Sequence, residues 1–213
     1  MPGAINQPAV VLVEGKEDER FFGAFAKRFN LDKIQVIAVG GRTRFAERLR
    51  TIKSSPGFAT VRYLIVVRDA DKDAKAAFQS VQTALINAGL PAPDRPLVST
   101  GNTHPVVTVV ILPGGERPGK LEDLCLDSVN QDPAFCCVDQ YFECLKTRIP
   151  VEEFPQDFSK ARVQAFLASR REPDLRLGEA AEKGYWPLDS EPFTEIKELL
   201  CKIGEQLGTS QGK

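Results

Sequence analysis

The chain has 213 residues, of which 42% are hydrophobic, and its 28 basic and 29 acidic side chains leave a net charge of −1. This length suits one core, or a main domain with a small helical appendage. The near-neutral charge argues against a strong, sequence-independent grip on nucleic acid, which normally requires a basic surface. No apolar run approaches the ~20 residues of a membrane span, and the amino terminus lacks the features of a secretory signal. We therefore expect a cytoplasmic protein without a membrane partner.

The first 120 residues alternate short apolar runs with amphipathic segments. A helical pattern follows the first run, strands are expected at 9–13, 34–39, 61–67, 97–99 and 106–112, and further helices at 45–52 and 72–88. This alternation predicts a parallel sheet with right-handed crossovers. Beyond residue 120 the pattern is helical, with candidates at 121–129, 134–146, 159–169 and 191–207.

The fold expected from this pattern is α/β, a mainly parallel sheet flanked by helices, with a helical carboxyl-terminal extension. We expect an α/β domain over residues 1–130, a helical extension packed on it over 131–207, and a disordered tail at 208–213.

The five cysteines offer no clear metal site. No Cys-x-x-Cys pair is present, and the single histidine, His104, lies far upstream of most of them: Cys125, Cys136, Cys137, Cys144 and Cys201. An odd number without an export signal suggests reduced thiols. At helical positions, cysteine behaves as a small buried hydrophobe. The sequence therefore favours packing over zinc binding.

Acidic residues follow two of the expected strands. Glu14 comes directly after the first strand, and Asp69, Asp71 and Asp73 alternate after the third. The carboxyl ends of parallel strands lie at the edge where open α/β sheets place their ligands. Carboxylate oxygens there suit a hard divalent cation. For Asp-x-Asp taken alone, a turn of solvated acids is the simpler interpretation.

The loop after the last strand offers a rival site. Residues 114–120 satisfy Gly-x-x-x-x-Gly-Lys, the spacing of a phosphate-binding P-loop. However, Leu121 stands where that motif needs Ser or Thr, and Pro118 removes a backbone donor. Glu122 and Asp123 add negative charge at the positive end of the following helix. Nucleotide hydrolysis at this loop is therefore disfavoured, and Glu122 is either a further acid at the metal site or a helix N-terminal acid.

Two segments together resemble a known domain. Val13-Glu14-Gly15-Lys16-Glu17-Asp18, followed by Asp69-x-Asp71, is similar to the Toprim domain, in particular that of OLD-type nucleases and of a small nuclease that matures ribosomal RNA. Leu112-Pro113-Gly114-Gly115 and the segment 118–124 resemble stand-alone Toprim-like proteins of unassigned activity. Many Toprim proteins have a glycine shortly after Asp-x-Asp, where this chain has Asp73 and Ala74. The resemblance covers residues 8 to 130.

The resemblance implies Mg²⁺- or Mn²⁺-dependent phosphodiester chemistry on nucleic acid. It implies Glu14, Asp69 and Asp71 as the catalytic residues, with the aspartates as metal ligands and the glutamate as a ligand or general acid/base. The resemblance matches Asp18 to a further acid of OLD-type sites, and Asp73 and Glu122 are weaker candidates. The metal-binding candidates in full are Glu14, Asp18, Asp69, Asp71, Asp73 and Glu122. Four cations are candidates for phosphate contact, although each by itself is typical of a solvated surface charge: Lys16, Arg42, Arg44 and Lys120.

Other functional classes stay open at this point. A non-catalytic metal- or nucleotide-binding module of Toprim fold, regulating a partner, fits the near-neutral charge and the missing glycine. An interaction protein whose acids only solvate the sheet edge predicts no saturable Mg²⁺ binding. The candidate partners are accordingly nucleic acid, a second copy of the chain in a homodimer, or another protein. Metal-dependent cutting abolished by Asp69→Ala would separate the enzyme from the binding module.

Overall fold

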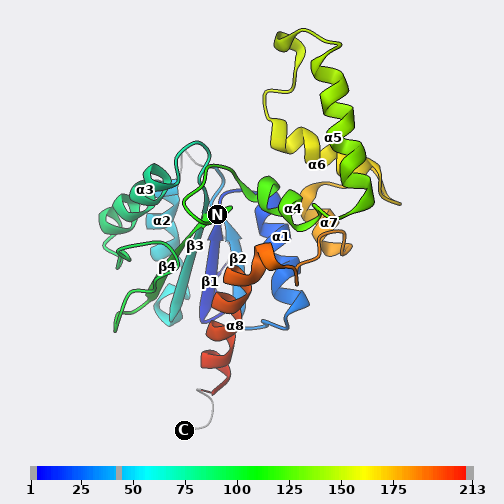
Figure 1. Cartoon of the computed structure of the whole chain (residues 1–213). Coiled ribbons are helices and arrows are strands. Elements are labelled where there is room, and N and C mark those ends of the chain that lie inside the picture. Colours follow the sequence, from blue (N-terminus) through cyan, green and yellow to red (C-terminus); the bar gives the residue numbers. More distant parts are fainter. Residues whose placement is uncertain (1–3, 42–44, 210–213) are drawn as a thin grey trace.

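The structure is a computed structural model that describes residues 4–41 and 45–209. Four strands form a wholly parallel sheet in the order β2-β1-β3-β4. The strands are β1 (Ala9–Val13), β2 (Ile34–Ala38), β3 (Tyr63–Asp69) and β4 (Val106–Leu112). The predicted α/β fold with a helical carboxyl-terminal part is confirmed (Figure 1).

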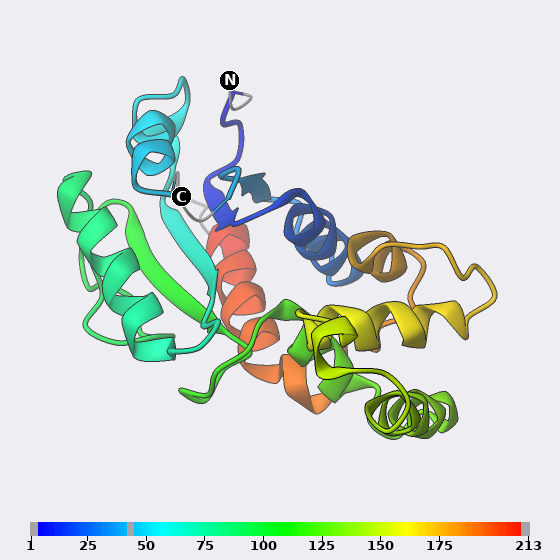
Figure 2. The same cartoon turned by 90° about the horizontal axis from the view of Figure 1, so that it is seen from above.

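Helices cover both faces of the sheet. Along the chain they are α1 (Lys16–Arg28), α2 (Phe45–Lys53), α3 (Ala74–Asn87), α4 (Leu121–Ser128), α5 (Pro133–Lys146), α6 (Phe158–Ala168), α7 (Leu177–Glu182) and α8 (Thr194–Thr209). Short 3₁₀ helices lie at Phe58–Thr60, Val151–Glu153 and Glu191–Phe193. Seen from above, α2 and α3 lie on one side of the strands, and α1 with the carboxyl-terminal helices on the other (Figure 2).

The sheet separates two hydrophobic cores because successive side chains of a strand point to opposite faces. In β1, Val10 and Leu12 join α2 and α3, whereas Val11 and Val13 face the core that contains α1. Helices α4 to α8 all contribute buried side chains to the core that contains α1. The helical extension is therefore part of the packing of the sheet.

Helix α1 shows how the sequence dictates this packing. Phe21, Phe22 and Phe25 follow helical spacing and are all buried. Acids occupy its first turn and basic residues its last turn, as the helix dipole favours. Phe193, from the far end of the chain, packs 5.7 Å from Phe21 and 6.2 Å from Phe25 between ring centroids.

Some local predictions differ from the structure. Residues 97–99 form no strand, because Leu97 has φ of 61°, outside the extended region. The segment still runs along β4, where Leu97 N–H donates to Val109 O at 2.8 Å. β3 continues through Asp69, which pairs in register with Leu112, and α7 had no counterpart among the expected helices.

The cysteines of α5 also differ from expectation. Cys125 is buried, as predicted, but Cys136, Cys137 and Cys144 are exposed. Helix α5 buries only one face, through Phe135, Val138 and Phe142, so the remaining positions face solvent.

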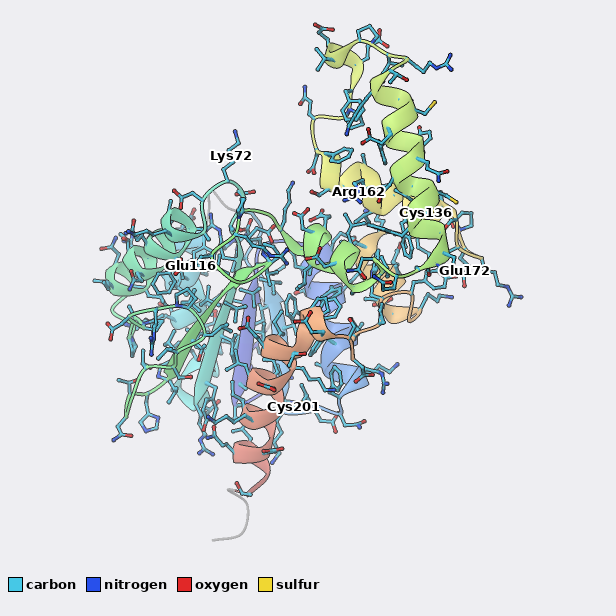
Figure 3. The ribbon with its side chains drawn as sticks, in the orientation of Figure 1. Lys72, Glu116, Cys136, Arg162, Glu172 and Cys201 are labelled. Carbon is cyan, nitrogen blue, oxygen red and sulfur yellow. The ribbon has the colours of Figure 1, made fainter. Side chains whose placement is uncertain are left out.

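Residues 133–168 form a helical arm made of α5, Val151–Glu153 and α6. In Figure 1 the arm extends beyond the sheet, on the side where Lys72 of the β3–α3 loop lies in Figure 3. Within the described ranges no helix is both long and apolar enough to cross a membrane. α8 ends at Thr209, and the rest of the expected tail lies outside the described residues.

Candidate carboxylate site at the ends of β1 and β3

Glu14 directly follows β1 and forms an ion pair with Arg68 of β3. Arg68 Nε lies 2.6 Å from Glu14 Oε1, and the arginine side chain is only 6% exposed. Neither of these two atoms has a hydrogen-bond partner among the described residues, so the contact counts as an ion pair without a hydrogen bond. The guanidinium carbon also lies 5.4 Å from the ring centroid of Phe45. Arg68 thus fixes Glu14 from inside the sheet.

Asp18 lies in the first turn of α1 and faces other acids. Its Oδ2 accepts a hydrogen bond from Gly15 N–H at 2.7 Å, which caps the helix. Burial raises the pKa of Asp18 to about 6, and the charges of Glu122, Glu14 and Glu17 add to that effect. The pKa reaches this value although the hydrogen bond from Gly15 lowers it.

Asp69 is the last residue of β3 and the most strongly perturbed acid of this group. Burial raises its pKa to about 8, reinforced by the charges of Asp18, Glu14 and Glu122. Its Oδ1 accepts a hydrogen bond from Leu121 N–H at 3.0 Å, which joins the end of β3 to the start of α4. This single bond does not offset the loss of water around the carboxylate.

Glu122 completes the group from the first turn of α4. Burial raises its pKa, and the neighbouring charge of Lys120 opposes the rise. Glu14, Asp18, Asp69 and Glu122 therefore form one electrostatically coupled set, which we call the four-carboxylate cluster. In the part of the chain that the structure describes, no three His, Cys, Asp or Glu side chains are arranged to hold a metal ion. The cluster is close enough for mutual repulsion but is not preassembled as a coordination site.

Asp71 and Asp73 occupy the loop between β3 and α3. Asp71 has φ of 51°, and its N–H and C=O both bond to Gly119 at 2.8 Å. Asp73 caps α3, accepting a hydrogen bond from Ala76 N–H at 2.9 Å. Asp73 therefore has a structural role, and metal binding by either aspartate stays a prediction.

A cleft of about 910 Å³ opens beside the cluster. Its walls are the loop after β3, the segment 118–123, and residues 156–159 at the start of α6 on the helical arm. The Lys120 side chain connects two of these walls, because its Nζ lies 2.6 Å from Asp157 Oδ2 on the arm. Burial lowers the pKa of Lys120, but the hydrogen bond and charge of Asp157 outweigh it, so the pKa is raised. Ser159 Oγ also donates to Asp123, so two side-chain contacts fasten the arm to the start of α4.

The predicted phosphate contacts are spread over different places. Lys120 lies in the cleft, whereas the Lys16 side chain is 81% exposed and pairs with Glu19. Arg42 and Arg44 lie outside the described residues.

Sequence reasoning missed three contributors: Arg68, Asp157 and Phe158. Arg68 had a signal, since it is a charge at the end of an apolar strand run and directly precedes Asp69. Asp157 and Phe158 lie more than 30 positions beyond the last recognised motif, so spacing gave no hint that they line the same cleft as Asp69.

Comparisons with known proteins give one family and one set of solved structures. The family model described as protein of unknown function DUF3226 matches residues 8–205. The chain is similar to the carboxyl-terminal region of the OLD protein of Xanthomonas campestris pv. campestris. The mercury-phased structure is 13% identical, with 95% of this chain and 98% of that chain covered and a TM-score of 0.49. The iodine-phased structure is 14% identical, with the same coverage and a TM-score of 0.48. Comparison with curated proteins found no match.

Proposed function

The chain belongs to DUF3226, a family of proteins of unknown function, and we propose that it cleaves phosphodiester bonds of nucleic acid with the help of Mg²⁺ or Mn²⁺. The four-carboxylate cluster is the observation that carries this proposal. Burial and like charges raise the pKa of Asp18 to about 6 and that of Asp69 to about 8. A group of acids held together at such an electrostatic cost is typical of a functional site.

The donor set fits a hard divalent cation. Every candidate ligand supplies carboxylate oxygen, which Mg²⁺ and Mn²⁺ prefer over nitrogen or sulfur. A cation would offset the burial of the Asp18 and Asp69 carboxylates and the like-charge repulsion that adds to their raised pKa. Asp69 and Asp71 would hold the metal, with Glu14, Asp18 and Glu122 beside them.

Divalent ions bound there would neutralise charge on the attacking and leaving oxygens of a phosphodiester. The chain's own groups have separate tasks. Glu14, fixed by Arg68, would accept the proton of the attacking water. Lys120 would contact the phosphate once substrate displaces its bond to Asp157.

A second candidate is a non-catalytic metal- or nucleotide-binding regulatory module. It is favoured by the charge of the cleft, which presents five acidic but only three basic side chains and would repel a polyanion in the absence of cations.

Calorimetric titration of Mn²⁺ and Mg²⁺ tests the proposal. We expect saturable binding to the wild type and to Asp32→Ala, whose exposed carboxylate lies outside the cleft, but none to Asp69→Ala/Asp71→Ala. Plasmid DNA and a structured RNA then serve as substrates in the presence of Mn²⁺. Cutting by the wild type and the control alone would support the nuclease. Metal binding without cutting would favour the second candidate, and no saturable binding by the wild type would contradict the metal site.

A further inference from the structure

Phe158 brings an aromatic ring to the wall of the cleft that faces the acids. It is the first residue of α6, directly after the helix-capping Asp157. It is 36% exposed and lines the cleft together with Gln156 and Ser159. Asp69 lines the same cleft from the end of β3. A ligand that covers this ring would remove apolar surface from water, which is favourable.

The ring is held rigidly by its neighbours. Phe142 meets it edge-on, with centroids 5.1 Å apart and planes at 81°, and Phe154 lies 5.7 Å away. These contacts fix the ring before any ligand arrives, which reduces the entropy that binding would otherwise lose. Phe158 is thus a preformed platform.

Cations gather around this platform. Lys146 Nζ and Arg162 Cζ each lie 5.7 Å from the centroid of Phe158. Arg162 belongs to the helical arm (Figure 3), and Lys120 lines the cleft. Lys146 is ion-paired with Glu143 and Arg162 with Asp139, and Asp157 lines the same wall as the ring. The ring therefore lies among charges of both signs, opposite the mainly acidic wall at the end of the sheet.

An aromatic ring flanked by cations suits one kind of ligand in particular. An unpaired nucleobase offers a free π-face for stacking, and its backbone phosphates are attracted to lysine and arginine. Bases inside a duplex already stack on both neighbours and present no free face. The volume of about 910 Å³ lies within the range of small-ligand pockets, so it suits one or two nucleotides.

We propose that Phe158 stacks on an unpaired base, so that the cleft takes single-stranded nucleic acid in preference to duplex. This inference rests on the proposed function, because it names the substrate class of the same site. The base would lie against the helical arm, and the adjoining phosphate would point to the acids at the end of β3.

Fluorescence of 2-aminopurine tests the stacking. A 12-residue single-stranded DNA carrying one central 2-aminopurine is titrated with the protein in Ca²⁺, alongside the same strand in a duplex and an RNA of the same sequence. Stacking on Phe158 should quench the emission of a single strand, whether DNA or RNA. We expect single strands to bind about tenfold more tightly than the duplex.

Matched variants separate stacking from packing. Phe158→Leu keeps an apolar side chain and should weaken single-strand binding about tenfold, the scale of one lost base–aromatic contact. Phe158→Tyr keeps the ring and should bind like the wild type. Tyr141→Leu removes an exposed ring of the same arm that does not line the cleft and should leave binding unchanged. Melting temperatures confirm that each variant is folded.

The outcomes distinguish this inference from the proposed function. Equal binding of strand and duplex, equal effects of Phe158→Leu and Tyr141→Leu, or no binding by the wild type would overturn the inference. Ring-dependent binding without any cleavage in Mn²⁺ would leave it standing and refute the nuclease. Cleavage that Phe158→Leu leaves unchanged would support the nuclease and overturn the inference.

Discussion

At the scale of single residues, Asp69 couples the acidity of the site to the stability of the fold. Its pKa is about 8 in the folded chain against an ordinary value of 3.8. At a pH between those two pKa values, the Asp69 carboxyl is ionised in the unfolded chain but still protonated in the folded chain. Folding then takes up a proton, so stability falls as pH rises from about 4 to about 8.

Asp69→Asn should remove this pH dependence. Asparagine keeps an oxygen for the hydrogen bond from Leu121 N–H but has no charge to desolvate. In urea unfolding with EDTA, we expect the variant to gain on the order of 2 kcal/mol over the wild type at pH 8 and almost nothing near pH 4. Asp73→Asn, at an exposed helix cap that asparagine also satisfies, should show the same small change at both pH values. An Asp69→Asn effect that is independent of pH would contradict the raised pKa.

We expect Arg68 to stabilise the fold as well as to hold Glu14 in the site. Arg68→Met removes the partner of Glu14 inside the protein, so the free energy of unfolding should fall by about 3 kcal/mol. Arg62→Met, at an exposed arginine just before β3, should change it by less than about 0.5 kcal/mol. Adding Glu14→Gln to Arg68→Met should recover part of the loss, because no unpaired charge is then left. Equilibrium urea unfolding measures all three variants.

The sequence was informative about residues at the ends of strands. Acids after β1 and β3 had to meet once the strands were parallel and adjacent, and the structure brings Glu14 and Asp69 into one group with Asp18 and Glu122. The ion pair of Arg68 was not predictable in the same way. The direction of the Arg68 side chain depends on β3, and this strand runs two residues further than the apolar run indicated.

At the scale of elements, the crossing of α1 and α7 depends on a glycine. A Cβ at Gly178 would lie 2.6 Å from Arg20 Cβ and 2.7 Å from Glu17 O. Gly178→Ala should therefore force the helices apart and lower stability by about 1–3 kcal/mol.

Gly23 provides a matched control on α1 itself. A Cβ there would meet nothing within 4 Å, so Gly23→Ala should raise stability by up to about 1 kcal/mol through helix propensity. Thermal unfolding of both variants measures the contrast. Equal changes in the melting temperature of both variants would show that the close approach of α7 to α1 does not restrict the side chain at position 178.

Elements were predicted best where their pattern was long. The run of phenylalanines in α1 and the apolar runs of β1 and β4 gave the correct type, because burial on one or both faces fixes their periodicity. Helix α7 has only six residues, too few for a periodic signal. This helix is stabilised by its packing on α1 and has no periodic apolar pattern of its own that would predict it.

At the scale of the whole molecule, the near-neutral charge limits how the protein can hold nucleic acid. Few cations line the cleft, so few counterions are released on binding. A plot of log K against log salt concentration for the single-stranded DNA should have a slope no steeper than about −3. Fluorescence titrations from 50 to about 300 mM salt measure it. A slope near −6 would indicate a second basic surface away from the cleft.

The overall fold was largely predictable, whereas the position of the arm was not. Alternating strands and helices allow few topologies, but the direction in which α5 and α6 extend depends on contacts such as Lys120 with Asp157, across 37 positions. No local pattern encodes such a contact. The cleft wall was therefore beyond sequence reasoning although each of its helices was expected.

The packing of α8 has a consequence for how the protein is made. This final helix of 16 residues, with the adjoining Phe193, completes the core around α1. A ribosome releases the amino-terminal end first, so the phenylalanines of α1 emerge long before the side chains that cover them. One face of the sheet closes only after α8 has been synthesised, and until then chaperones and other nascent chains meet an open apolar surface.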